Sequence, residues 1–158
     1  MKALVVYYSR SGNNHKIAGE VAKALGADIE RLKEKADRSG SVGYMKAGRD
    51  SMKKRPAELE PVGNDAANYD VVVLGGPVWA WAMNPPVRTY ALQNKDRFRK
   101  LAVFSTGGAA QFAQNAIDDL RSVTGISPVA TLALSDKDVG GNHSKALSDF
   151  VAAIAARG

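Results

Sequence analysis

The sequence contains no cysteine. A chain without cysteine forms no disulfide bond, no thiolate metal site and no thiol redox centre. The absence fits a reducing compartment, and we expect a cytoplasmic protein. Met1 to Ala3 lead directly into the first predicted strand, so we expect no signal peptide before the fold.

Long apolar runs are also missing, and no stretch approaches the length that crosses a bilayer. The sequence shows no internal repeat, low-complexity tract or linker. Its 158 residues, 45% hydrophobic and 24% charged, suffice for one domain with a substantial core. We therefore predict a single domain over residues 1–158 with no membrane association.

Acidic residues are fewer than basic ones, which gives a formal net charge of +6. Part of the excess lies between Lys33 and Glu60, a segment that contains eight Lys or Arg residues and five acidic residues. No nucleic-acid-binding motif accompanies this segment. We interpret it as a solvated surface and predict no nucleic-acid partner.

Several motifs of well-known enzyme classes are absent. The sequence has no G-x-x-x-x-G-K-[ST] loop and no G-x-G-x-x-G, which argues against nucleotide triphosphatases and dinucleotide-binding enzymes. It has no G-x-S-x-G elbow, which argues against an α/β-hydrolase. A phospho-acceptor receiver would need acidic residues where Ser9 and Ser11 stand. His15 and His143 begin different predicted helices, where surface or capping roles are expected, and no His/Asp/Glu cluster predicts a metal site.

Apolar strands alternate with amphipathic helices along the chain. Val5 to Tyr7 read as a buried strand, and Ile17, Val21 and Leu25 mark one face of a helix that ends at Gly26. An edge strand is expected at 27–32, a polar segment at 33–60 with a short helix at 44–54, a strand at 69–76 and a loop at 77–83. A helix capped by Asn84 and begun by Pro85 comes next, followed by a strand at 100–105. The remaining elements are a helix that carries Phe112, Ala116, Ile117, Leu120 and Val123, a strand at 128–134, a loop at 135–141 and a final helix. This alternation predicts an α/β fold, a doubly wound five-stranded parallel sheet with helices on both faces.

The loop after the first strand is small and polar. Ser9, Ser11, Asn13 and Asn14 supply uncharged donors at a helix start, where backbone N–H groups and the helix dipole favour a phosphate. The alternative is an ordinary capped helix without a ligand, because Ser and Asn are favoured caps.

In doubly wound sheets, ligands bind beyond the carboxyl ends of the strands. The loops expected there are 9–14, 77–83, 106–111 and 135–141. The first three are rich in glycine, hydroxyl, amide and aromatic side chains, with almost no acid or base. Such loops suit a flat, phosphorylated aromatic molecule better than hydrolysis or proton transfer. Trp79 and Trp81, the two tryptophans of the chain, favour a stacking platform. Because they are two residues apart, we expect one ring to face the ligand and the other to pack inward.

These features resemble the flavodoxin-like family over nearly the whole chain. Asn14 stands where the family has threonine, and the segment from Gly76 to Arg88 looks like short flavodoxin-type proteins. The other residues that fit the family's first-loop signature are Val5, Val6, Tyr7, Ser9, Gly12, Ala18 and Val21. The resemblance implies the strand order 2-1-3-4-5. It also implies that FMN binds at the switch point between the first and third strands, where the strand order reverses.

The resemblance also implies three sets of cofactor-binding residues and no catalytic side chain. Those expected to hold the phosphate are Ser9, Arg10, Ser11, Gly12, Asn13 and Asn14. Those expected to border the isoalloxazine ring are Pro77, Val78, Trp79, Ala80 and Trp81. Those expected to close its other side are Thr106, Gly107 and Gly108.

The chain departs from the family pattern at two points. Ala80 and its neighbours offer less freedom at positive φ than the glycine of many flavodoxins. The chain is basic, whereas electron-carrying flavodoxins are usually acidic. We therefore expect electron transfer through FMN to a redox partner with an acidic docking face, or to a small-molecule acceptor. The alternatives are an FMN-dependent NAD(P)H:quinone or flavin reductase and a binding module without flavin.

Overall fold

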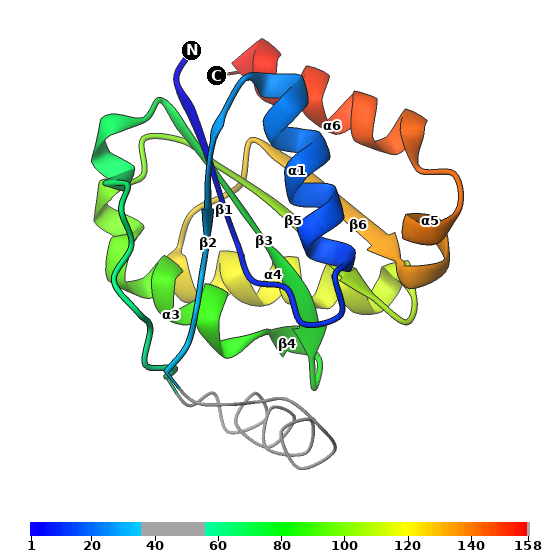
Figure 1. Ribbon diagram of the computed structural model, residues 1–158, viewed down its shortest axis with the longest axis horizontal. Helices are drawn as coiled ribbons and strands as arrows, with labels where there is room; N and C mark the ends of the chain where they lie inside the picture. Colours follow the sequence, from blue (N-terminus) through cyan, green and yellow to red (C-terminus); the bar gives the residue numbers. More distant parts are fainter. Residues whose placement is uncertain (36–55, 158) are drawn as a thin grey trace.

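The sheet is built around parallel strands in the order β2-β1-β3-β5-β6. The computed structural model describes residues 1–35 and 56–157 (Figure 1). Counted along the chain, the five parallel strands follow the predicted order 2-1-3-4-5. Their bounds are Ala3–Tyr7 for β1, Asp28–Arg31 for β2, Val71–Trp79 for β3, Leu101–Gly107 for β5 and Ala130–Ser135 for β6.

A sixth strand corrects the predicted five-stranded sheet. β4 (Ala82–Met83) pairs antiparallel with the end of β3, where Trp79 is opposite Ala82. The prediction of a loop at 77–83 was therefore wrong, because β3 runs on through Pro77 and turns back on itself. Pro77 lacks an N–H, but its carbonyl accepts a hydrogen bond from Asn84 Nδ2 at 3.0 Å.

Helices cover both faces of the sheet, α1 and α6 on one side and α3 and α4 on the other (Figure 1). The α-helices are α1 (Asn13–Leu25), α3 (Pro85–Asn94), α4 (Ala110–Thr124), α5 (Asp136–Gly140) and α6 (Ser144–Arg157), and the 3-10 turns are η1 (Ala66–Asn68) and η2 (Lys95–Arg97). α5 replaces the predicted loop at 135–141. Its start is capped by Ser135, whose Oγ accepts from the Asp138 N–H at 3.1 Å.

The core has two layers because neighbouring residues of a strand face opposite sides of the sheet. Both layers are almost free of solvent, as expected for a parallel sheet covered on both faces. The layer beneath α1 and α6 includes Val5, Val73, Phe104, Ile17 and Ile154. The layer beneath α3 and α4 includes Val6, Leu74, Val103, Tyr90 and Ile117.

Local signals at the ends of elements are largely confirmed. Gly26 ends α1 in the left-handed region with φ +61°, and Asn84 Oδ1 caps α3 by accepting from the Val87 N–H at 3.0 Å. β2 lies at the sheet edge, as predicted, but the charged side chains expected to point outward do not alternate with a buried Ile29, which is 44% exposed, whereas Glu30 is partly buried. Phe112 lies in α4, as predicted, but is 47% exposed and does not belong to the buried face of that helix. The short helix predicted at 44–54 lies outside the described residues.

Within the described part of the chain, every helix is too short or too polar to span a membrane.

Candidate cofactor site

The β1–α1 loop leaves the first turn of α1 open. Gly12 occupies the N-cap position with φ +99°, and among the described residues no side chain caps the helix. The first turn also carries no acidic residue. Ser9 Oγ accepts from the Gly12 N–H at 3.2 Å, which holds the turn in shape. The N–H groups that begin a helix then lie at its positive end, an arrangement that suits an anion.

A basic residue of β2 supports this loop from the side. Arg31 donates from Nη2 to the Ser9 carbonyl oxygen at 3.2 Å. Its guanidinium also lies 5.9 Å from the centre of the Tyr7 ring. Burial raises the pKa of the Tyr7 hydroxyl, although Arg31 opposes the shift, so the phenol is neutral at pH 7. That hydroxyl forms a hydrogen bond with His15 Nδ1.

Asn14 joins the first loop to the end of β5. Its Nδ2 donates to Thr106 Oγ1 at 2.9 Å, and both residues are only 2% exposed. Asn14 Oδ1 is buried and has no hydrogen-bond partner among the described residues. The structure thus brings together two of the predicted loops through one buried amide.

The start of α1 is also fastened to α5. Asn13 Nδ2 donates to Asp136 Oδ1 at 3.0 Å, and Lys16 Nζ donates to the Val139 carbonyl at 3.1 Å. The sequence placed the segment 135–141 at this edge, but no local pattern indicates that Asp136 accepts from Asn13. The contact places a carboxylate next to the open helix end, where it opposes the binding of an anion.

The β3–β4 turn consists of two residues with positive φ. Ala80 has φ +48° and Trp81 has φ +67°. Positive φ at both central residues is the requirement of a type I′ hairpin turn, for which Asn and Gly are preferred. Ala80 was expected to disfavour such a backbone, yet the structure places it there. The left-handed region costs a residue with a Cβ about 1–2 kcal/mol, which pairing of Trp79 with Ala82 must offset.

The two tryptophan rings face different ways, as the sequence predicted. Trp79 is partly buried and packs edge-on against Tyr8, with ring centres 5.5 Å apart and an interplanar angle of 88°. Trp81 is 64% exposed and lies nearly parallel to Phe112, with ring centres 6.0 Å apart. The exposed pair bridges the β3–β4 turn and the first turn of α4.

The loop after β5 lies close against β3. A Cβ on Gly107 would stand 2.6 Å from Val78 Cγ1, so a larger residue here would require the Val78 side chain to move. Ser105 Oγ donates to the Gly76 carbonyl at 2.8 Å and ties the two strand ends together. At Gly108 a Cβ would meet no atom of the described residues within 4 Å. This loop is therefore anchored on one side and open on the other.

All three predicted loops meet at one edge of the sheet, where β1, β3 and β5 end (Figure 1). Sequence reasoning missed four residues that shape this edge. Tyr8 directly follows β1 and Arg31 is the last residue of β2, so their positions at the strand ends could have indicated that they lie at this edge. Phe112 stands four residues before the buried Ala116, a spacing that favours the same helix face, so the sequence did not indicate its outward position. Asp136 lies in the segment 135–141 that the sequence placed at this edge, but no pattern indicated its contact with Asn13.

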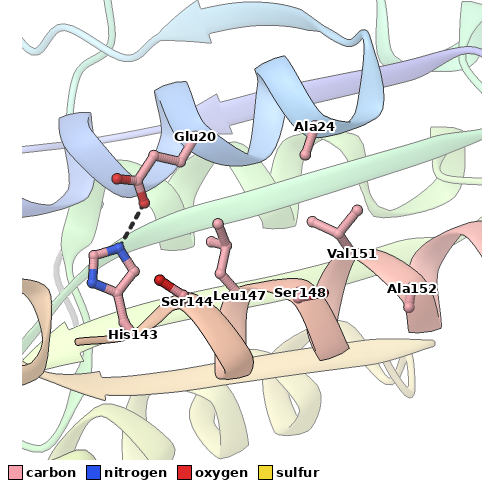
Figure 2. A pocket seen from close by; sticks show the side chains of 8 residues that line it. All are labelled: Glu20, Ala24, His143, Ser144, Leu147, Ser148, Val151 and Ala152. Atoms are coloured by element: carbon pink, nitrogen blue, oxygen red, sulfur yellow. Dashed lines mark hydrogen bonds and ion pairs between the residues drawn. The ribbon is translucent and has the colours of Figure 1, made fainter.

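A cleft of about 560 Å³ lies away from this edge, between α1 and α6 (Figure 2). Glu20 points from α1 toward His143, and its Oε2 lies 2.7 Å from His143 Nε2. His143 Nδ1 lies 3.0 Å from the Asp138 carbonyl oxygen. The side chain of His143 is 9% exposed, so it is not a free surface residue. The residue stands at the start of α6, as predicted, where its carbonyl oxygen accepts from the Leu147 N–H at 2.9 Å.

The sequence profile of the flavodoxin family matches residues 2–133. This chain belongs to the flavodoxin family. The matched range includes β1 to β5 and therefore all three loops of the candidate site. A search of curated proteins finds no significant match.

Solved structures of other flavodoxin-like proteins share the fold. A flavoprotein from Lactobacillus acidophilus NCFM in complex with FMN is 22% identical, with a TM-score of 0.69 over 88% of this chain and 96% of its own. A candidate flavoprotein from Bacteroides eggerthii DSM 20697 is 20% identical, with a TM-score of 0.76 over 98% of each chain. Oxidised flavodoxin 2 from Bacillus cereus is 18% identical, with a TM-score of 0.59 over 100% of each chain. At these identities the likeness establishes the flavodoxin fold.

Proposed function

We propose that this flavodoxin-family chain binds FMN at the carboxyl edge of its sheet and transfers electrons through it. The observation that supports the proposal is an open start of α1, whose own first turn has no acidic residue, beside aromatic loops beyond the carboxyl ends of the neighbouring strands β1 and β3. A phosphate fits the first feature and a flat ring fits the second.

The residues at this edge fit FMN in three respects. The space around Gly12 is open, since a Cβ there would meet no atom of the described residues within 4 Å, and its φ of +99° favours glycine. Arg31 brings a positive charge to the Ser9 carbonyl. Asn14 holds a buried polar atom without a partner among the described residues. The phosphate would lie at residues 9–14, and the ring would lie against residues 77–81 and 106–108.

FMN supplies reversible redox chemistry when it is bound. The protein's own contribution is to hold the phosphate with backbone N–H groups, to shield the ring with Trp81 and Phe112, and to present few acids or bases near it. An electron carrier needs these tasks and no side chain that moves protons. The relative from Lactobacillus acidophilus with FMN supports the choice of cofactor.

The partner we propose carries an acidic docking face or is a small-molecule acceptor. The net charge of +6 supports this, since opposite charge speeds the encounter of two proteins. Arg31 lies at the rim of the site and adds to that charge locally. We expect electron transfer to an acidic protein to slow as salt is added.

The first test is whether the purified protein contains or binds flavin. We expect a yellow protein, or a flavin-free protein that binds added FMN with quenching of flavin fluorescence. Anaerobic reduction should then proceed in two separable one-electron steps. Direct two-electron bleaching, together with fast NADH or NADPH oxidation in the presence of a quinone, would show the reductase instead. A protein that refuses added FMN contradicts the proposal.

A single substitution tests the position of the phosphate. Ser11→Asp places a negative charge on the exposed loop before α1. We expect weaker binding of FMN and unchanged binding of riboflavin, which has no phosphate, because like charges repel at short range. Ser148→Asp on α6 is the matched control and should change neither. Equal loss of both flavins in Ser11→Asp would contradict the placement.

A further inference from the structure

The side-chain amide of Asn14 is buried, and only one of its two polar atoms has a hydrogen-bond partner among the described residues. Its Nδ2 donates to Thr106 Oγ1 at 2.9 Å, whereas its Oδ1 has no hydrogen-bond partner among the described residues. The side chain is 2% exposed. A buried polar atom without a partner is costly, so a native protein keeps one where a ligand or a water completes it.

The orientation of the amide does not change this conclusion. If the amide is turned over, the Thr106 hydroxyl donates to Oδ1, and the NH₂ group then lacks an acceptor. In one orientation the missing partner is a donor, and in the other it is an acceptor. A hydroxyl group is both, so an alcohol completes Asn14 in either case. A phosphate, which only accepts at neutral pH, completes it in one orientation alone.

The position of Asn14 indicates which alcohol this is. Asn14 lies in the first turn of α1, where the proposed function places the phosphate. Its partner Thr106 lies at the end of β5, where the proposed function places the ring. The part of FMN that joins phosphate to ring is the ribityl chain, which carries hydroxyl groups.

We infer that Asn14 recognises a hydroxyl of the ribityl chain and is a specificity-determining residue for flavins that carry this chain. The inference rests on the proposed FMN site and moves Asn14 from the phosphate set, where the sequence placed it, to the ribityl chain. The Thr106 hydroxyl positions the amide by holding one end of it. Asn13 and Ser11 remain with the phosphate.

The test compares ligands that differ only in the chain. Binding of FMN, riboflavin, lumiflavin and a flavin with a plain pentyl chain in place of ribityl is measured by quenching of flavin fluorescence. We expect the wild-type protein to bind riboflavin about tenfold more tightly than the pentyl flavin. In Asn14→Leu, which keeps the volume and removes the amide, this preference should vanish, and lumiflavin should bind as to wild type.

The controls separate the possible failures. Asn68→Leu removes an exposed amide from η1 and should leave all four affinities unchanged. If Asn14→Leu does not fold, as judged by circular dichroism, Asn14→Ala replaces it, because alanine is favourable in a helix. A preference for riboflavin that survives in the variant overturns the inference, and so does an equal loss of every flavin, which would show a merely structural role.

The wild-type protein distinguishes this inference from the proposed function. If it binds no flavin at all, both fail. If it binds FMN and riboflavin but binds the pentyl flavin equally well, the inference fails and the proposed function stands.

Discussion

Asn13 Nδ2 donates a hydrogen bond to Asp136 Oδ1 over 3.0 Å, which joins the start of α1 to the start of α5. The two residues are 123 positions apart in the chain. The contact brings a negative charge beside the helix end that we propose for a phosphate. The site therefore holds one group that opposes its ligand, and the strength of that opposition can be measured.

We expect Asp136→Asn to bind FMN more tightly by about two- to fivefold, since an exposed charge pair is worth about 0.3–1 kcal/mol. The asparagine still accepts from Asn13, so the contact remains while the charge is removed. Fluorescence titration at low salt measures the gain, which should shrink as salt is added. Riboflavin should bind as before.

Asp149→Asn on α6 is the matched control, because it removes the same charge from an exposed position. Its FMN affinity should stay within the error of the wild-type value. If both variants gain equally, net charge rather than the place of Asp136 explains the effect.

In the β3–β4 turn, we expect a substitution by glycine to stabilise the protein. Ala80→Gly should raise the free energy of unfolding by about 0.5–1 kcal/mol, because relief of the left-handed backbone outweighs the added freedom of the unfolded chain. Urea unfolding of the flavin-free protein measures it. Ala152→Gly in α6 is the control and should lower stability by about 1 kcal/mol. A similar loss in both variants would show that Ala80 is unstrained.

This turn also shows where sequence reasoning stops. A two-residue hairpin is predicted from Asn-Gly or Asp-Gly, and Ala80-Trp81 has neither. The preceding Pro77 further argued against a strand. What forms the hairpin is tertiary: Asn84 bonds the Pro77 carbonyl, and β5 pairs with β3 up to Pro77 itself.

Structural features that depend on residues close together in the sequence were predictable. The apolar run of β1 followed by small polar residues, the stop at Gly26 and the Asn84 cap before Pro85 are all confirmed. The short helix α5 had a usable signal too, since Ser135 and Asp138 have the spacing of a helix cap. Contacts such as Asn14 with Thr106 join distant segments, and no local pattern indicates them.

Substitutions of the two tryptophans should have different effects, one mainly on the stability of the protein and the other mainly on flavin binding. Trp79 is partly buried against Tyr8, so we expect Trp79→Ala to lower the free energy of unfolding by about 2 kcal/mol. Trp81 is mostly exposed, so Trp81→Ala should cost less than about 1 kcal/mol but weaken lumiflavin binding about three- to tenfold through lost stacking. Urea unfolding and fluorescence titration measure the two effects. Unchanged lumiflavin affinity in Trp81→Ala would exclude it from the ring site.

Two buried tyrosines give the protein a predictable response to alkaline pH. The hydrogen bond to Asp28, with burial, raises the pKa of Tyr69 to about 12, and burial raises the pKa of Tyr90 to about 12. The folded protein thus keeps protons that the unfolded chain loses near pH 10. Their contribution to stability is complete below pH 10 and is lost as the pH rises toward 12.

Phenylalanine variants distinguish the two rings. The Tyr90 hydroxyl has no hydrogen-bond partner in the part of the chain that the structure describes, so Tyr90→Phe should leave stability at pH 7 unchanged or raise it by up to about 1 kcal/mol. The Tyr69 hydroxyl bonds Asp28 at 2.7 Å and Asn64 at 3.0 Å, so Tyr69→Phe should lower stability by about 1–2 kcal/mol. Between pH 10 and 12, each variant should lose less stability than the wild type, because one titrating group is gone. Urea unfolding at pH 7 and above pH 10 measures both, and an alkaline loss in Tyr90→Phe as steep as in the wild type would show that Tyr90 does not contribute to it.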